Sequence, residues 1–185
     1  ISLGRYSKAR ASLERLREAA SEIGGQRQEG YVALLEAELL RVESRIDASI
    51  EAADRALSAA ETAADGPLLV RSCRSLGYSL LFAGRLQDAV HYLLRSLSAC
   101  RRYGADHLLG DVYATLGYAA LRAGRTERGA SFLRRGISRL EESGYQVRLA
   151  VARCHYGSHL VIRGNLREAA QQYQASLAEQ YDCQA

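Results

Sequence analysis

The sequence has no methionine and no tryptophan, and it has one proline (Pro67) and one lysine (Lys8) in 185 residues. Without an initiating methionine, and without the charged and apolar regions of a signal peptide after Ile1, the chain is expected to be a piece of a longer protein. Arg, Glu or Asp interrupts every apolar run before the roughly 20 residues that a membrane-spanning helix needs. We therefore expect no membrane contact.

Close cysteine pairs and a bias of charge are also missing. The 25 basic and 21 acidic residues interleave along the chain and leave a net charge of +4, so we predict no direct nucleic-acid contact. The cysteines show neither a CxxC pair nor the spacing of a disulfide framework, which indicates small buried residues in a reducing compartment and hence a cytoplasmic protein. They are Cys73, Cys100, Cys154 and Cys183.

Small residues recur every 40 residues, and this period is the strongest feature of the sequence. Segments 76–97, 116–137 and 156–177 align without a gap. Three sets of small residues coincide in them: Gly77, Gly117 and Gly157; Gly84, Gly124 and Gly164; Ala89, Gly129 and Ala169. Earlier steps reach Ser44 and Gly4, so the chain opens just before the second half of a repeat. A fixed period of this size indicates a repeat architecture.

Within a unit the apolar residues follow the period of an α-helix. One stripe comprises Leu86, Ala89, Val90, Leu93, Leu94, Leu97 and Cys100. The first half of each unit is also helical, so each unit is a helix pair, and no strand pattern remains. Glycines able to take a left-handed C-cap conformation stand where each second helix should end, at Gly24, Gly104 and Gly144.

The prediction is an all-α, right-handed α-solenoid of antiparallel helix pairs that forms a single array over residues 1–185. It has nine helices: a lone helix at about 5–22, then repeats at about 27–64, 67–104, 106–144 and 146–182. A helix pair cannot bury its apolar stripe alone, so neighbouring pairs must cover one another. Small residues of the first set let the two helices of a pair touch, and those of the third let the next helix dock.

Leu76-Gly77, Leu80, Gly84, Ala89 and Leu93 resemble the defining positions of the tetratricopeptide repeat. The 40-residue unit is longer than the usual 34 residues of that family, and Cys73, Tyr113 and Arg153 replace its tryptophan. With its arginine-rich helices, the chain is similar to the sensor arrays of bacterial LuxR-type and signalling-ATPase transcriptional regulators. This resemblance implies a non-catalytic module that binds a protein or peptide and acts as sensor or scaffold.

The resemblance also implies a binding surface, because the first helix of each pair lines the concave wall in that family. The outward positions would be 31, 34, 38, 41 and 42 and their equivalents 40, 80 and 120 residues later. From these we predict a protein-binding row of aromatic and charged residues: Arg71, Arg74, Tyr78, Phe82, Asp111, Tyr118 and Arg122. The alternative is that some of these positions belong to the core between helices. Tyr78 and Tyr118 stand where co-chaperone members have the asparagine of a carboxylate clamp, so that clamp is absent.

His155 and His159 share one helical face and are the weak candidates for a metal site, because the sequence near them offers no acidic ligand. No nucleophile, phosphate loop or Ser/His/Asp arrangement can be assembled, so we predict neither catalysis nor a cofactor. Alternatives to the regulator module are a domain that binds a small-molecule effector and a free-standing tetratricopeptide adaptor. The partner could also be another copy of the chain or another domain of the same polypeptide.

Overall fold

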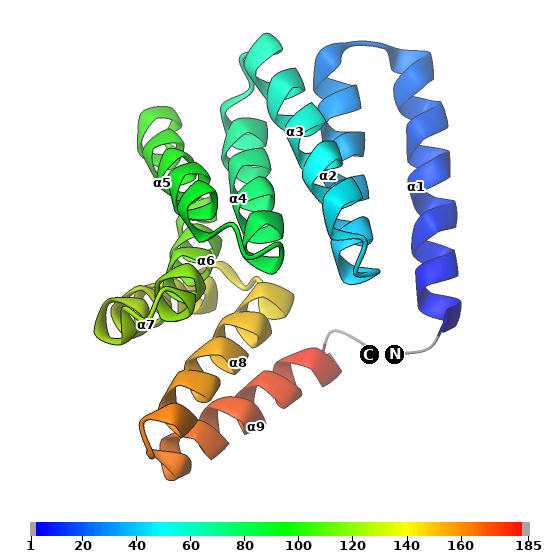
Figure 1. The fold of residues 1–185 in the computed structure, drawn as a ribbon. Coiled ribbons are helices and arrows are strands. Elements are labelled where there is room, and N and C mark those ends of the chain that lie inside the picture. Colours follow the sequence, from blue (N-terminus) through cyan, green and yellow to red (C-terminus); the bar gives the residue numbers. More distant parts are fainter. Residues whose placement is uncertain (1–2, 183–185) are drawn as a thin grey trace. The chain divides into compact units, whose positions relative to one another are not determined.

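The computed structural model describes the backbone of residues 3–182 and the side chains of residues 7–179. Over that part of the chain it contains nine α-helices, one short 3₁₀ turn and no strand (Figure 1). None of the described helices is long and apolar enough to cross a membrane. The helices divide by their internal contacts into two compact units, Ile1–Ala105 and Asp106–Ala185.

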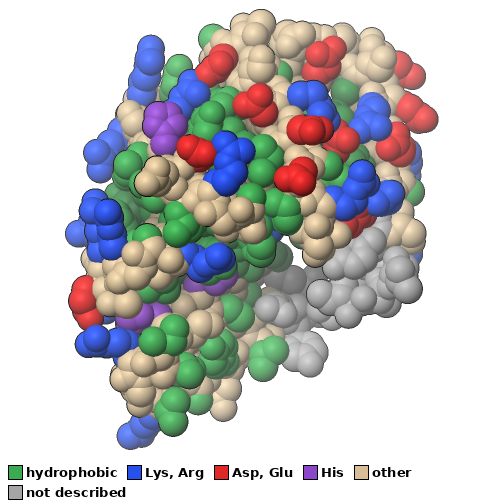
Figure 2. Space-filling view, viewed as in Figure 1, with side chains coloured by type: hydrophobic (Ala, Val, Ile, Leu, Met, Phe, Trp, Pro, Cys, Tyr) green, Lys and Arg blue, Asp and Glu red, His purple; other side chains and the backbone are tan. Residues whose placement is uncertain are grey.

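The first unit contains the lone helix and two helix pairs. Its helices are α1 (Leu3–Ile23), α2 (Gln26–Val42), α3 (Ile46–Thr62), α4 (Gly66–Phe82) and α5 (Leu86–Tyr103). Successive helices run antiparallel, and α2 packs on α3 as α4 packs on α5 (Figure 1). Helix α4 also contacts α3 and α2, so each pair covers the next. Acidic and basic side chains interleave over the face of this unit that Figure 2 shows.

The second unit contains two further pairs built in the same way. Its elements are η1 (Asp106–Leu108), α6 (Leu109–Arg122), α7 (Thr126–Ser143), α8 (Gln146–Ile162) and α9 (Leu166–Asp182). Helix α6 packs on α7, α8 packs on α9, and α7 and α6 both contact α8. The predicted fold class, an all-α solenoid of antiparallel helix pairs, is confirmed. The prediction of a single array over 1–185 stays a prediction.

Glycines of the first set let the two helices of a pair touch, as predicted. A Cβ atom at Gly117 would lie 2.7 Å from Leu133 Cγ and 2.9 Å from the carbonyl oxygen of Gly129. At Gly77 it would lie 2.7 Å from Leu93 Cγ. These distances are too short for a carbon atom, so the helices pack closely because the side chains are missing.

The glycines of the turns are needed for a different reason, which is their left-handed backbone conformation. Gly84, Gly124 and Gly164 have φ angles of 76°, 72° and 76°, and nothing lies within 4 Å of where a Cβ atom would be. In the first pair Ser44 adopts the same conformation, with φ 62°. The predicted left-handed conformation is confirmed at Gly24, Gly104 and Gly144, each directly after the end of a helix. Their equivalent Ala64 has φ 50°, although a side chain is strained there.

We expect Ala64→Gly to raise the free energy of unfolding by about 0.5–1 kcal/mol, because glycine removes the left-handed strain at some cost in chain entropy. Urea denaturation followed by circular dichroism measures the change. Ala63→Gly is the matched control, because Ala63 has φ −79° and gains nothing from glycine. Equal stability of the two variants would contradict the prediction.

Buried serines add hydrogen bonds that the sequence did not suggest. The Ser96 hydroxyl donates to the Val70 carbonyl oxygen at 2.8 Å, and two repeats later the Ser176 hydroxyl donates to the Ala150 carbonyl oxygen at the same distance. Each bond joins the second helix of a pair to the first helix of that pair. Because buried polar groups must be paired, these bonds fix the register of the two helices.

The predicted burial of the cysteines is confirmed at two of the three that the structure describes. Cys73 and Cys100 are buried, and burial raises the pKa of the Cys73 thiol to about 11. Cys154 is partly buried, and its sulfur lies 3.2 Å from the Ser176 hydroxyl. Cys183 lies outside the described residues.

Candidate functional site

The predicted binding row lies on the first helices of two pairs. Arg71, Arg74, Tyr78 and Phe82 are on α4 in the first unit, whereas Asp111, Tyr118 and Arg122 are on α6 in the second. In both units the first helices of neighbouring pairs lie in contact, α2 with α4 and α6 with α8. Side chains on this row therefore have neighbours on an adjacent first helix as well as on their own helix.

In the first unit a guanidinium and two rings form one cluster. The Arg41 guanidinium carbon lies 4.5 Å from the centre of the Tyr78 ring and 5.9 Å from that of Phe82. The two rings meet edge to face with centres 5.3 Å apart. Tyr78 is 8% exposed, but Phe82 is 47% exposed. The cluster thus has a buried base and an accessible ring, a geometry that favours both ring packing and cation–π attraction.

Arg74 is a structural residue of this unit. It is 4% exposed, and its Nη2 atom donates to Glu38 Oε1 on α2 at 2.6 Å. The ion pair ties α2 to α4, because the guanidinium that Arg74 buries in the contact between these helices is matched by a carboxylate. Arg71, one turn earlier, is half-buried.

The prediction that all five positions face outward is wrong at the second position in three of the four pairs, and at the third and fourth positions in one pair each. The second position is buried in the first three pairs, at Leu34, Arg74 and Ala114, and Tyr78 and Leu81 are also buried. The reason is the contact between neighbouring first helices, which covers the rows on their shared flank. These residues are therefore part of the core between helices, which was the alternative interpretation of the sequence.

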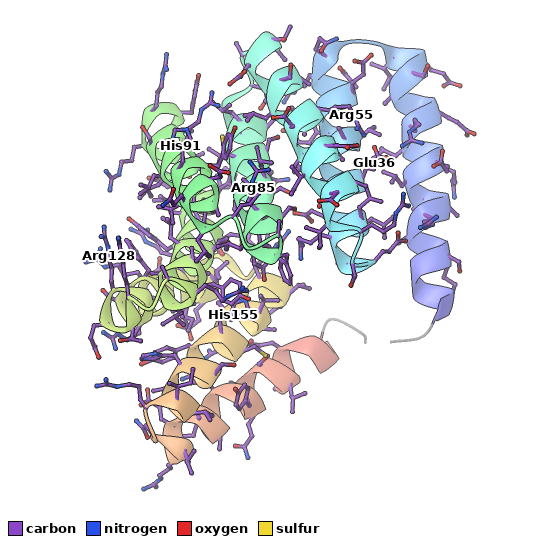
Figure 3. All side chains as sticks on the ribbon, in the orientation of Figure 1. Glu36, Arg55, Arg85, His91, Arg128 and His155 are labelled. Carbon is purple, nitrogen blue, oxygen red and sulfur yellow. The ribbon has the colours of Figure 1, made fainter. Side chains whose placement is uncertain are left out.

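In the second unit Tyr118 stacks on His155 of α8, with ring centres 4.0 Å apart and planes 17° from parallel. The Arg122 Nη1 atom donates to the Tyr118 hydroxyl at 3.0 Å, and Arg122 itself is exposed. Asp111 pairs with Arg148 of α8 at 3.5 Å. Figure 3 labels His155 on α8. Two predicted residues, Tyr118 and Asp111, thus meet two residues that the binding prediction did not include, His155 and Arg148.

The histidines do not converge on one point. His155 stacks on Tyr118, whereas His159 is 6% exposed and lies beside Tyr156, with ring centres 6.2 Å apart. Among the described residues no group of three or more His, Cys, Asp or Glu side chains is arranged to hold a metal ion. Burial lowers the pKa of His155 to about 4, so its ring is neutral at pH 7.

We expect acid to destabilise the fold through His155. Its pKa is about 4 in the folded chain against about 6.5 when exposed, so below pH 6.5 the unfolded chain takes up the proton first. The contribution of His155 to the free energy of unfolding is fully present above pH 6.5. It is lost as the pH falls towards 4, by at most about 3 kcal/mol. Urea unfolding at pH 7 and pH 4.5 measures it.

His155→Phe keeps a ring against Tyr118 without a titrating group, so its stability should depend less on pH than that of the wild type. His91→Gln serves as the control because His91 is exposed. The same pH dependence in wild type and His155→Phe would contradict the assignment.

One repeat position stays accessible in every pair. It is the last of the five outward positions and holds Val42, Phe82, Arg122 and Ile162. Val42 is 49% exposed, Phe82 is 47% exposed and Ile162 is 80% exposed. The repeat alignment placed these residues in one row. Only their exposure in the structure distinguishes them from the covered positions of the same helices.

No protein-family model matches the sequence, and no curated protein matches it. Solved structures do resemble the fold. A Rap protein complexed with competence and sporulation factor superposes with a TM-score of 0.82 at 14% identity, over 96% of this chain and 51% of its own. BtubC (BKLC) from P. vanneervenii has a TM-score of 0.69 at 17% identity, over 98% of this chain and 75% of its own.

A putative kinesin light chain from Podospora anserina, with nearly identical TPR-like repeats, has a TM-score of 0.62 at 13% identity, over 98% of this chain and 89% of its own. This chain therefore spans about half the length of the Rap protein and most of the kinesin light chain structure. At these identities the likeness concerns the fold. The chain has the fold of a tetratricopeptide-like helical repeat.

Proposed function

We propose that this chain is a non-catalytic module that binds a protein or peptide segment along the ends of its first helices. The observation that carries the proposal is the accessible repeat position, where large apolar side chains stand exposed at Val42, Phe82 and Ile162. A folded chain has no stability reason to expose apolar side chains at the same place in three of four repeats, whereas a binding surface does.

In the first unit the accessible row has the composition of a binding hot spot. Phe82 rests on Tyr78, and Arg41 lies over both rings, so the exposed ring is held in place before a partner arrives. A preorganised aromatic anchor loses little conformational entropy on binding. In the second unit Ile162 supplies the apolar contact, and Arg122, held by Tyr118, supplies a cation.

The wider context of the proposal is the sensor or scaffold part of a bacterial cytoplasmic transcriptional regulator. Its support is the likeness to sensor arrays in the repeat sequence, together with a Rap structure in which that protein is complexed with competence and sporulation factor. The bound segment could belong to another protein, a second copy of the chain or another domain of the same polypeptide. This context can be tested by searching the coding sequence on both sides of this chain for ATPase and DNA-binding segments.

We expect peptides selected on this chain from a phage-displayed library of random dodecapeptides to depend on the exposed row. The double substitution of Val42→Ser with Phe82→Ser should weaken a selected peptide at least about tenfold, since a truncated anchor costs about 1–3 kcal/mol. Isothermal titration calorimetry of the synthetic peptide measures the loss.

Leu94→Ser is the matched control, because Leu94 has the same 47% exposure as Phe82 but lies on the second helix of the pair. Its affinity should stay within twofold of the wild type. Failure to enrich any peptide, or equal losses in both variants, would overturn the proposed surface.

Sedimentation at several concentrations identifies self-association, which the row substitutions should abolish if the partner is a second copy.

A further inference from the structure

A hollow of about 450 Å³ lies in the Asp106–Ala185 unit between α6 and α7. It is lined by Tyr113 of α6 and by Arg134, Arg135, Ser138 and Arg139 of α7. Phe132 stacks beside Tyr113 with ring centres 6.1 Å apart, and Arg128, labelled in Figure 3, lies over Phe132. This hollow is built from residues other than the accessible row proposed above as a binding surface.

Close approach of the two helices holds the lining residues in place. A Cβ atom at Gly136 would lie 2.7 Å from the amide nitrogen of Ala114, and one at Gly110 would lie 3.1 Å from Arg139 Cβ. Both helices therefore touch through glycine at the level of the hollow. The backbone positions of Arg135 and Arg139 relative to Tyr113 are rigidly set as a result.

The position of Arg135 also holds arginine in the lone helix α1, at Arg15, and in two other helix pairs, and the arginines of those two pairs are neutralised. Arg55 donates to Glu36 at 2.8 Å (both labelled in Figure 3), and Arg95 donates to Glu61. In the repeat alignment, the residue that stands to Arg135 as Glu36 stands to Arg55 is Leu116. The residue that stands to Arg135 as Glu61 stands to Arg95 is Arg101. Arg135 forms no ion pair with any residue whose side chain the structure describes.

The position of Arg139 shows the same contrast. In the fourth pair the positions of Tyr113 and Arg139 hold Arg153 and Glu179, which form an ion pair at 2.6 Å. In the third pair a neutral ring faces the arginine instead. Arg139 has only a long pair of 3.7 Å with Glu142 on its own exposed helix surface, and Arg134 donates to Tyr156 Oη at 3.4 Å. Such exposed pairs are weak.

We infer that this hollow binds the anionic side chains of an acidic peptide segment. Guanidinium groups form two parallel hydrogen bonds to a carboxylate or phosphate, and clustered arginines are a common device for recognising acidic motifs. Ser138 and Tyr113 supply hydroxyl groups that can donate to the same oxygens. The missing glutamates of this repeat are thus replaced by carboxylates of the ligand.

A nucleic-acid backbone fits the charge pattern less well. Glu127, Glu141 and Glu142 lie on the same helix as the arginines and interrupt the basic surface near the hollow. A polyanion gains affinity by neutralising a row of evenly spaced phosphates, which needs an extended basic stripe. A hollow of this size accepts one or two anionic groups, as an acidic peptide segment presents them.

The test uses a fluorescein-labelled hexaglutamate peptide with the whole chain and measures fluorescence anisotropy at low salt. We expect saturable binding that Arg135→Gln with Arg139→Gln weakens at least tenfold, and no binding of hexaglutamine. The control is Arg125→Gln with Arg167→Gln, which removes the same charge from exposed sites of the same unit outside the hollow. It should stay within twofold of the wild type.

Amide chemical shifts of Gly110 and Gly136 should move on addition of the peptide, which locates the contact independently of affinity. Equal weakening by both double variants would overturn the inference, because it would assign the binding to net charge. Binding of a single-stranded RNA hexamer more tightly than hexaglutamate, with loss in the hollow variant, would also overturn it in favour of a nucleic acid. Inorganic phosphate that competes at millimolar concentration supports the oxyanion chemistry of the site.

Discussion

Leu93→Ala is expected to lower the free energy of unfolding by about 2–5 kcal/mol, the largest single effect that the structure indicates. Leu93 has no exposed surface, and its Cγ atom lies over Gly77 at the contact between α4 and α5. Truncation removes buried apolar surface and leaves a cavity that the closely packed helix pair cannot close. Urea denaturation monitored by circular dichroism at pH 7 gives the change.

The neighbouring residue provides the control. Leu94 lies on the same helix and has the same size, but it is 47% exposed. Leu94→Ala should change the free energy of unfolding by no more than about 0.5 kcal/mol, as is usual for surface positions. If the two alanine variants lose equal stability, the assigned face of α5 is wrong.

Gly117→Ala is expected to destabilise the fold by about 1–3 kcal/mol, although alanine is the better helix former by about 1 kcal/mol. The added carbon atom would lie 2.8 Å from the Leu133 amide nitrogen and 2.9 Å from the Gly129 carbonyl oxygen. Both are backbone atoms of α7, so relief requires the two helices to separate. Thermal and urea unfolding of the variant measure the cost.

Gly157→Ala is the matched substitution in the next repeat. There the nearest atoms, at 3.0–3.3 Å, belong to the ring of the partly exposed Tyr173, which can move by a few tenths of an ångström. This variant should stay within about 1 kcal/mol of the wild type because the gain in helix propensity offsets the strain. Greater stability of Gly117→Ala than of the wild type would show that α6 and α7 do not touch there.

The contrast between these two glycines shows what a repeat alignment can and cannot tell. Both stand at the same position of the pattern, and the pattern alone predicts the same role for both. The partner residue differs, Leu133 and Gly129 in one pair and Tyr173 in the other, and only coordinates show which atoms are backbone and which belong to a side chain. The expected cost of the substitution depends on that difference.

Much of the candidate surface could be predicted because the first helix of a pair has a fixed place in the repeat. Phe82 and Arg122 are exposed as expected, and the alignment also placed Val42 and Ile162 in their row. Tyr78 could not be judged from the sequence, since an aromatic residue suits both a core and an interface. Its burial depends on Arg41 and on the contact between α2 and α4.

The sequence by itself determined the helix pairs, their 40-residue period and the left-handed caps, because helix periodicity and glycine conformation are local properties of the chain. The tertiary structure alone decided that Arg74 is buried against Glu38, that Tyr118 stacks on His155 and that Arg55 pairs with Glu36 of the neighbouring helix. These outcomes depend on how far each helix is rotated against its neighbour. That rotation is set by contacts between residues distant in sequence, which a local pattern does not encode.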